Sequence, residues 1–364
     1  MRFGTLGPFV LGPFVLAVLL LSAAVRPLAA APPEVVVTIN PVHSLVAAVM
    51  EGVAEPTLLV RGAASPHSYS LRPSDAKALN RAQLVFWVGE GLETFLIEPL
   101  AALSGEAKVV EVAALPGIGL LETREGGAWE AHVHGEGHHG HDHDHDHDHD
   151  HDHDHAASRD QHGHDEHGHD EHGHAEHGHH EHGHEAHAHA EGKDLHLWLD
   201  PGNAKVIVEA AVQSLSEADP ANAGRYRANG KAALARLDSL DEELKAALAP
   251  VKDAPFVVFH DAYQYFEAHY GLTAVGSISV SEGRAPGAKR LREVREKIAE
   301  TGARCVFAEP QFQPALVATV VEGTAARTGV LDPVGADLAE GPEAYAELLR
   351  GLAGALNKCL APQS

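Results

Sequence analysis

The sequence is poor in cysteine, in basic residues and in long apolar runs, and each shortage excludes a class of protein. Only two cysteines occur in 364 residues, Cys305 and Cys359, and no CxxC pair is present, so a zinc ribbon and a thioredoxin-type redox motif are both excluded. Lys and Arg number 27 against 52 Asp and Glu, with nothing like a basic stripe, which disfavours a nucleic-acid partner.

The one long apolar run lies at the N-terminus. An arginine follows the initiator methionine, residues 9–25 are apolar, and residues 28–31 offer small side chains for cleavage. Two prolines argue against a stable membrane-spanning helix, and no cysteine marks a lipid-attachment point. We therefore predict a signal peptide over residues 1–30 and a soluble, periplasmic mature protein. In that compartment Cys305 and Cys359 favour a disulfide over a metal site or redox motif, tying the C-terminus to the body.

Histidine is abundant and strongly clustered. Of 30 histidines, 25 lie in residues 132–189, with strict His-Asp alternation from His141 to His155. This stretch has almost no aliphatic residue and no apolar face to bury, so we predict a disordered insertion. Neutral imidazole is a common zinc ligand, and the carboxylates would raise the local cation concentration. The alternating histidines are thus candidate loop ligands: His141, His143, His145, His147, His149, His151, His153 and His155. The alternative is an inert linker, but linkers favour Gly, Ser and Pro.

The insertion also carries most of the negative charge. Residues 130–191 hold 18 acidic residues and one arginine, which is −17 of the formal −25. The remaining −8 is ordinary for a soluble protein. Without the signal peptide and the insertion, about 270 residues remain, enough for two domains of ordinary size.

Outside the insertion, strand-like and helix-like segments alternate twice. Apolar, β-branched runs predict strands at residues 34–40, 57–60, 84–88, 108–112, 255–259, 273–278, 304–308 and 330–332. Helices are expected at residues 41–52, from Ser74 as the cap with Asp75 in the first turn, then at 201–217, 219–249, 262–270, 287–302, 314–329 and 343–360. This alternation is typical of an α/β fold with parallel sheets.

We therefore predict an α/β protein with two lobes of parallel β/α units joined by one long rigid helix. The expected domains are an N-terminal lobe at 31–218, including a disordered His-rich loop at 125–193, a linking helix at 219–250 and a C-terminal lobe at 251–364. Leucines spaced by three and four residues give the linking helix one apolar stripe, and Gly230 is its weak point.

Three histidines outside the tract share a setting. His67 lies in a loop after a strand, His260 follows a strand directly, and His196 precedes a helix. Ligands of open α/β sheets bind beyond the carboxyl ends of the strands, so these imidazoles could converge and bind Zn²⁺ with one position open. The alternative is that each histidine is satisfied separately. His43 and His269 fit helix surfaces or helix–sheet packing better than a metal site.

Three carboxylates accompany these histidines. Glu309 and Asp332 follow strands, and either could be a fourth ligand or could orient a ligating histidine; a helix cap or a turn is the alternative. Asp261, next to His260, is a candidate partner of that imidazole or the cap of the next helix.

Several segments together resemble a known family. Residues 64–75 (ASPHSYSLRPSD), 196–201 (HLWLDP), 258–263 (VFHDAY), 307–312 (FAEPQF) and 328–333 (TGVLDP) look like the periplasmic zinc-binding receptors of ABC importers, the ZnuA type. They come in the family's order and cover the chain outside the tract. The resemblance implies two lobes bridged by a rigid helix, zinc held by His67, His196 and His260, and a His-rich acidic loop.

Further details follow from the resemblance. Manganese members of the family use a carboxylate where this chain has His260, in line with the preference of imidazole for zinc. Cys305 and Cys359 match a disulfide found in some members. Some relatives carry Glu directly before the first ligand, whereas this chain has Pro66 there. The fourth ligand is therefore open between Asp332, water and the loop.

The leading hypothesis is a periplasmic zinc receptor, not an enzyme, which hands Zn²⁺ to an inner-membrane permease driven by an ATPase. It is expected to act as a monomer, to lose affinity on acidification as protons compete, and to move by small tilts without wide hinge closure. A zinc hydrolase is the second hypothesis, although no HExxH motif is present and Glu309 is the one tempting base. A plain zinc buffer, in which the tract binds all the metal, is the third.

Overall fold

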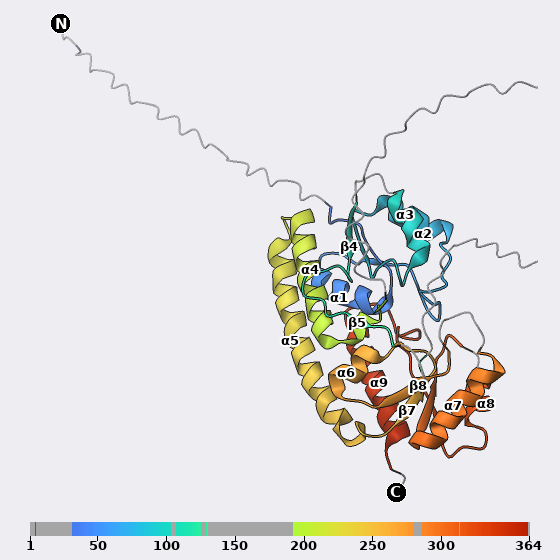
Figure 1. The fold of residues 1–364 in the computed structure, drawn as a ribbon. Helices are drawn as coiled ribbons and strands as arrows, with labels where there is room; N and C mark the ends of the chain where they lie inside the picture. The colour runs from blue at the N-terminus through green and yellow to red at the C-terminus, as the bar shows by residue number, and fades with distance from the viewer. Residues whose placement is uncertain are drawn as a thin grey trace, which may run out of the picture. The chain divides into compact units, whose positions relative to one another are not determined.

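A four-stranded parallel sheet forms the scaffold of the first lobe. In the computed structural model its order is β2-β1-β3-β4, made by Thr57–Leu58, Val35–Val37, Leu84–Trp87 and Lys108–Glu111. β1 and β3 are buried throughout, as expected for Val- and Leu-rich strands covered on both faces. The intervening helices are α1 (Asn40–Met50), α2 (Pro73–Arg81) and α3 (Ile97–Ala101), the last preceded by the 3₁₀ turn η1 (Thr94–Leu96) (Figure 1).

The second lobe repeats this plan with another four-stranded parallel sheet. Its order is β10-β9-β7-β8, made by Arg327–Val330, Cys305–Ala308, Phe256–Val258 and Ala274–Ser277. Its helices are α6 (Gln264–Tyr270), α7 (Ala288–Thr301), α8 (Pro314–Val321) and α9 (Ala344–Leu360). The prediction of an α/β fold with parallel sheets is confirmed.

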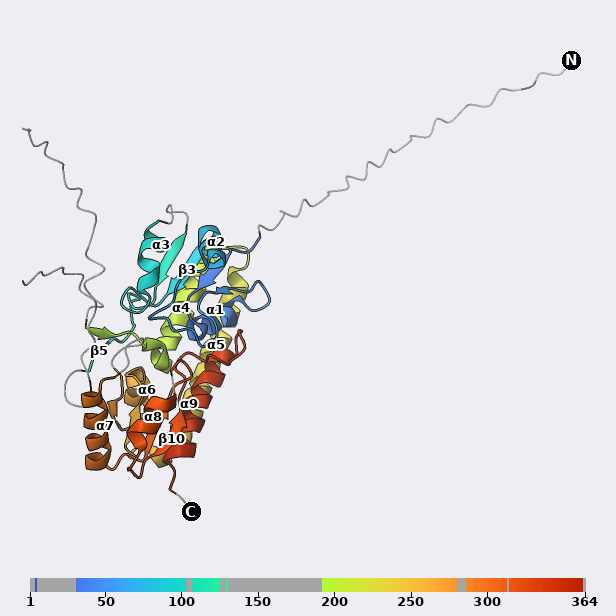
Figure 2. The ribbon, with the colours of Figure 1, turned by 90° about the vertical axis from the view of Figure 1, so that its right-hand side faces the viewer.

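Two long helices lie between these sheets in sequence, α4 (Pro201–Ala218) and α5 (Ala223–Leu248), with the turn η4 (Ala249–Val251) at the end of α5. The 26 residues of α5 span about 39 Å, and the helix packs against α1, α4 and α9 (Figures 1 and 2). Its leucine stripe is buried as predicted. One continuous apolar core includes β1, α5 and β9 side chains, among them Val36, Leu240 and Phe307.

The first and last helices of the fold touch each other. All eleven residues of α1 are buried, and α9 packs against them. The backbone N–H of Tyr345 donates a hydrogen bond of 2.9 Å to Oγ of Ser44, across 301 residues of sequence. Elements from the two ends of residues 32–364 therefore share one core.

A small antiparallel ribbon completes the architecture. β5 (Leu121–Glu122) pairs with β6 (Lys193–Asp194), and the 3₁₀ turn η3 (Leu197–Leu199) follows. The Lys193 and Glu122 side chains form an ion pair across the ribbon. β6 ends two residues before His196, and Asp194 in this strand contacts that histidine, so the ribbon lies beside the candidate site.

The structure describes residue 4 and residues 31–102, 107–124, 129, 192–279, 286–312 and 314–362. The predicted signal peptide lies outside these residues except for Gly4. The predicted loop ligands, from His141 to His155, lie outside them as well. Within the described ranges, no helix has both the length and the apolar composition needed to cross a bilayer.

Three local predictions were wrong. Ser74 is not the cap of α2, since the helix begins at Pro73, a residue suited to a first turn, with Arg72 as its cap. The helix predicted over residues 314–329 ends at Val321, because Gly323 turns the chain with a φ of 76°. The strand expected at 330–332 therefore starts earlier, at Arg327, where it pairs with β9.

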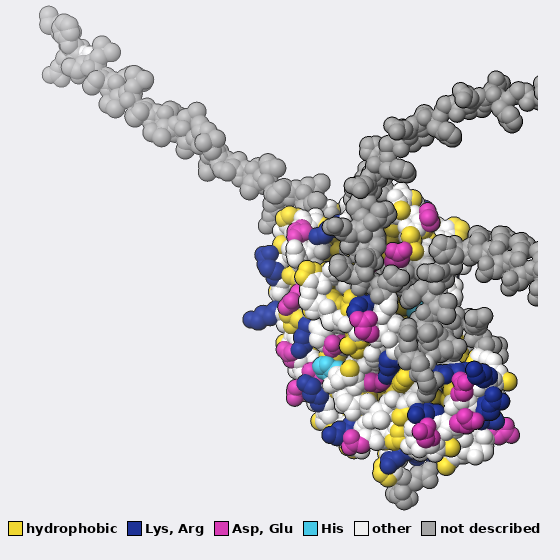
Figure 3. Space-filling view, viewed as in Figure 1, with side chains coloured by type: hydrophobic (Ala, Val, Ile, Leu, Met, Phe, Trp, Pro, Cys, Tyr) yellow, Lys and Arg dark blue, Asp and Glu magenta, His cyan; other side chains and the backbone are white. Residues whose placement is uncertain are grey.

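The predicted disulfide is present. Cys305 in β9 bonds to Cys359 in α9, which ties the last helix to the second sheet. On the described surface, acidic and basic side chains alternate over α5 and α7 (Figure 3), many of them in ion pairs such as Arg350–Glu243 and Lys297–Glu300. This mixture agrees with the modest charge that the sequence leaves outside the tract.

Candidate metal centre

Three imidazoles from distant parts of the chain meet at one point. His67 lies in the loop between β2 and α2, His196 precedes η3, and His260 follows β7. Nε2 of His196 lies 3.2 Å from Nε2 of His67 and 3.3 Å from Nε2 of His260. The ligand nitrogens all lie within 4.8 Å of one another, and this is the one such group of His, Cys, Asp or Glu in the described residues.

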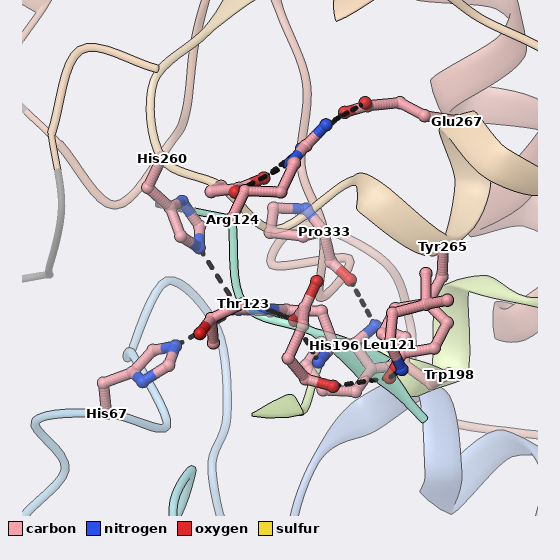
Figure 4. A network of polar contacts seen from close by, with 12 residues as sticks. His67, Leu121, Thr123, Arg124, His196, Trp198, His260, Tyr265, Glu267 and Pro333 are labelled. Atoms are coloured by element: carbon pink, nitrogen blue, oxygen red, sulfur yellow. Dashed lines mark hydrogen bonds and ion pairs between the residues drawn. The ribbon is translucent and has the colours of Figure 1, made fainter. Parts of the chain in front are cut away.

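The spacing matches zinc coordination. Nitrogens about 2.0–2.1 Å from a tetrahedral zinc ion are about 3.3 Å from each other. Figure 4 shows His260 above and His67 below, both to the left of His196 and directed toward it. His196 and His260 are 4% and 2% exposed, whereas His67, on its loop, is half-buried. The sequence-based prediction that these three histidines converge is thus met by the geometry.

Two carboxylates set the orientation of the buried imidazoles. Nδ1 of His196 lies 2.8 Å from Oδ1 of Asp194, and Nδ1 of His260 lies 2.8 Å from Oε1 of Glu309. When each Nδ1 donates its proton to its carboxylate, both Nε2 atoms present lone pairs to the same point. A cation placed there would relieve the mutual repulsion of these lone pairs.

Charge balance also favours a divalent cation. Asp194 and Glu309 are 4% and 2% exposed, so the site would hold two buried negative charges when both carboxyl groups are ionised and the imidazoles are neutral ligands. Buried charges are costly unless they are paired, and a dication among the three Nε2 atoms would compensate both carboxylates. The donor set is therefore well suited to Zn²⁺, which binds neutral imidazole readily.

The segment that carries His196 is anchored by the second lobe. Nε1 of Trp198 donates to the carbonyl oxygen of Pro333 at 2.8 Å (Figure 4), and the hydroxyl of Tyr345 donates to the carbonyl oxygen of Trp198 at 2.8 Å. The Trp198 and His196 ring centroids are 5.4 Å apart. His196 therefore has little freedom to move relative to the residues of the second lobe.

Comparison with known proteins agrees with this geometry. The family profile described as zinc-uptake complex component A, periplasmic (ZnuA) matches residues 35–359. The high-affinity zinc uptake system protein ZnuA of Brucella abortus (strain 2308) is 52% identical over 326 residues, which are 90% of this chain and 91% of that protein. Its namesake from Paracoccus denitrificans (strain Pd 1222) is 42% identical over 341 residues, 93% and 95% of the two chains. The chain belongs to the ZnuA family.

Solved structures share the fold. The periplasmic zinc-binding protein TroA from Treponema pallidum superposes with a TM-score of 0.66 at 21% identity, covering 91% of this chain and all of the other. A crystal structure of ZnuA gives a TM-score of 0.65 at 24% identity, with 91% of this chain and all of the other covered. The two-lobe architecture predicted from the family resemblance is confirmed.

The predicted fourth ligand is engaged elsewhere. The Asp332 carboxylate accepts backbone N–H groups of Val334, Gly335 and Ala336 at 3.1, 3.0 and 2.6 Å, in the manner of a turn cap. It does not belong to the group of converging ligand atoms within the described residues. Its role as a ligand stays a prediction.

The two predicted orienting carboxylates behave differently. Glu309 contacts His260 as expected, and its Oε1 also lies 3.3 Å from the backbone nitrogen of that residue. Asp261, although adjacent to His260 in sequence, pairs with Arg124 through an Nε–Oδ2 hydrogen bond of 2.9 Å. Burial would lower the pKa of Arg124, but hydrogen bonds to Asp261 and Glu267 raise it above its ordinary value.

The remaining two histidines, His43 and His269, do not belong to the converging group within the described residues. Nε2 of His43 is 3.0 Å from the carbonyl oxygen of Pro56, and burial lowers the His43 pKa. His269 bridges Asp200 and Asp241, with ring nitrogen to oxygen distances of 3.1 and 2.7 Å. Its hydrogen bond to Asp200 chiefly raises its pKa, against the opposing effect of burial.

Asp194 and Arg124 were not predicted from the sequence. Asp194 directly follows the predicted His-rich loop at 125–193 and was given no role. The available signal was the pattern Asp-x-His at 194–196, because a carboxylate two residues before an imidazole can reach its Nδ1. Arg124, beside the tract, gave no comparable signal in the sequence.

Proposed function

We propose that the chain is the periplasmic receptor of a zinc importer, binding Zn²⁺ at His67, His196 and His260 and delivering it to an inner-membrane permease driven by an ATPase. The observation that carries this proposal is the spacing of the three Nε2 atoms, with two Nδ1 atoms held by carboxylates. The names of the Brucella and Paracoccus relatives support zinc as the cargo.

Release of zinc should begin at His67. It is the ligand on a loop and the one that is only half-buried, whereas His196 and His260 are buried and fixed by carboxylates. The continuous core and α5 join the two lobes, which opposes a wide hinge motion. Docking on the permease would therefore act on the loop at residues 61–72 and leave the lobes nearly in place.

The proposed division of labour follows the predicted domains. Residues 31–218 and 251–364 supply the ligands, the helix at 219–250 holds the lobes together, and the His-rich loop at 125–193 gathers ions around the site. Asp332 would act as a fourth ligand only after leaving its turn, so an Asp332→Ala variant should weaken zinc binding less than loss of any of the three histidines.

Two other functions are less well supported. For a zinc hydrolase, Glu309 was the candidate base, yet it contacts Nδ1 of His260 and faces away from Nε2. Ester or peptide hydrolysis that disappears in His260→Ala would revive this hypothesis. A protein that only buffers zinc through its tract would still support growth in zinc-poor medium after His67→Ala or His196→Ala. A receptor carrying either substitution would not support growth there.

The decisive measurement is a calorimetric Zn²⁺ titration of the mature protein lacking residues 130–191. A matched variant carries the same deletion with His67, His196 and His260 changed to Ala. We expect one tight site in the first protein and none in the second, with circular dichroism showing that both are folded.

The opposite result would have a clear meaning. If the loop-free protein binds no zinc tightly while the full-length protein does, the tract is the functional site and the receptor proposal is wrong. A single tight site that survives the triple substitution would place the cargo elsewhere in the fold.

A further inference from the structure

The β5–β6 ribbon is too short to hold its own position. It has two residues in each strand, and a two-stranded ribbon is at best marginally stable without further support. Its position nevertheless matters for the proposed site, because Oδ1 of Asp194 in β6 accepts from both the backbone N–H and Nδ1 of His196, at 2.9 and 2.8 Å. The contacts that fix the ribbon therefore also fix one imidazole.

The first support is a tyrosine of α6. The hydroxyl of Tyr265 donates to the carbonyl oxygen of Asp194 at 2.5 Å and accepts the backbone N–H of Leu121 at 3.0 Å (Figure 4). One side chain of the second lobe thus joins both strands of the ribbon.

The second support is Arg124, two residues after β5. Its guanidinium pairs with both oxygens of Asp261 and donates from Nη1 to Oε2 of Glu267 at 2.6 Å. The three side chains are 20%, 7% and 6% exposed, and the Trp129 ring covers the guanidinium with its centroid 3.6 Å from Cζ. Such desolvated, charge-assisted contacts are strong when complete and costly when one partner is lost.

These contacts connect the proposed ligands of the two lobes. Arg124 holds Asp261, the neighbour of His260, while the ribbon that Arg124 fastens carries Asp194, the partner of His196. Figure 4 shows the Arg124 side chain directed toward Glu267, with His260 at the left of the view. We propose that Arg124 is a positioning residue of the zinc site, setting the distance between the His196 and His260 imidazoles by clamping the ribbon to Asp261 and to Glu267 of α6.

This inference rests on the proposed function, since it concerns the same metal site. It predicts that Arg124→Gln weakens zinc binding without removing a ligand. Loss of residues that orient metal ligands typically lowers metal affinity 10- to 100-fold. Arg124→Lys keeps the charge but cannot pair with two carboxylates through a planar fork, so it should recover only a small part of that loss.

The test uses the full-length mature protein loaded with zinc alone. Tract-bound ions are stripped with a weak chelator, and a strong chelator then measures the affinity and dissociation rate of the ion that remains. Arg350→Gln is the matched control, because Arg350 of α9 also pairs with a carboxylate distant in sequence, Glu243 of α5, but at an exposed position outside the ligand-bearing loops. It should change zinc affinity less than twofold.

A second control separates positioning from general destabilisation. Gly230→Ala perturbs the α4–α5 contact away from the site and should lower the stability of the zinc-free protein while leaving zinc affinity unchanged. Unchanged affinity and dissociation rate in Arg124→Gln would overturn the inference and leave the receptor proposal standing. Equal affinity losses in Arg124→Gln and Gly230→Ala would also overturn it. Absence of a tight ion in the unsubstituted protein would instead overturn the receptor proposal.

Discussion

Glu93 carries a carboxyl group that is buried in the first lobe and is not one of the proposed site residues. It is 0% exposed, and its Oε2 accepts the backbone N–H groups of Val88 and Gly89 at 2.6 and 3.2 Å. Burial raises the pKa of Glu93 from 4.5 to about 7, although its hydrogen bonds oppose the shift. The folded protein therefore retains a proton that the unfolded chain releases at a lower pH.

The sign of the pH dependence follows. Stability linked to Glu93 is fully present below about pH 4.5 and is lost as the pH rises through about 7. Glu93→Gln should remove this dependence, so that its stability relative to the unsubstituted protein rises by up to about 3 kcal/mol between pH 4.5 and 8. Urea unfolding at both pH values measures the difference. Glu98→Gln, on the exposed face of α3, should show no such gain, and a flat difference for Glu93→Gln would contradict the prediction.

At the residue scale, the three converging imidazoles could be predicted from the sequence, but only some of their partners could. His67, His196 and His260 could be predicted because each lies at the edge of a strand or helix where α/β proteins bind ligands. Glu309 was found for the same reason. Asp261 was chosen because it adjoins His260, but its side chain turns toward Arg124. Which neighbour contacts an imidazole depends on side-chain direction, which sequence adjacency does not give.

At the scale of elements, a side chain of α4 packs closely against the backbone of α5. A Cβ built on Gly230 of α5 would lie 2.3 Å from Cγ2 of Val212 in α4. Gly230, predicted to be a weak point of the helix, is thus the position that lets α4 lie against α5.

Gly230→Ala should therefore destabilise the protein, by about 1–3 kcal/mol, even though alanine is the better helix former. Gly224→Ala in the same helix is the matched comparison, since its Cβ would meet nothing within 4 Å. That change should be neutral or stabilising by up to about 1 kcal/mol. Thermal unfolding of the zinc-free proteins gives both values, and equal midpoints for the two variants would disprove the packing argument.

Element types were largely predictable, whereas some boundaries were not. The apolar periodicity of residues 237–248 and the β-branched runs are local signals, and they gave α5 and most strands. The segment at 322–330 lacked such a signal, because β10 forms through pairing with β9 and its start depends on the turn at Gly323.

At the scale of the whole molecule, the two lobes share one core. Buried side chains of both sheets and of α5 belong to the same apolar cluster, including Val36, Leu244 and Phe256. We expect the zinc-free protein to unfold in a single calorimetric transition. Two separate transitions would contradict this expectation.

Zinc should raise the midpoint of that transition. A ligand that binds only the folded state adds about 4 kcal/mol when its free concentration is a thousand times Kd. The variant with His67, His196 and His260 changed to Ala keeps the tract and is the control for ions bound there. Equal shifts in both proteins would mean that the stabilisation comes from the tract alone.

The sharing of one core was beyond sequence analysis. Two α/β repeats and a long helix between them could be recognised, but the faces that the lobes bury against each other carry the same apolar residues as any lobe interior. Nothing in the order of residues distinguishes a core inside one lobe from a core that passes between two.

The contact between α1 and α9 fixes an order of assembly. A ribosome makes α1 first and α9 last, and some 300 residues separate the hydrogen-bonded Ser44 and Tyr345. Until residues 344–360 exist, an apolar face of α1 has no partner to cover it. The growing chain therefore cannot complete its first lobe before its final helix has been made, so its earliest helix is among the last parts to be fully enclosed.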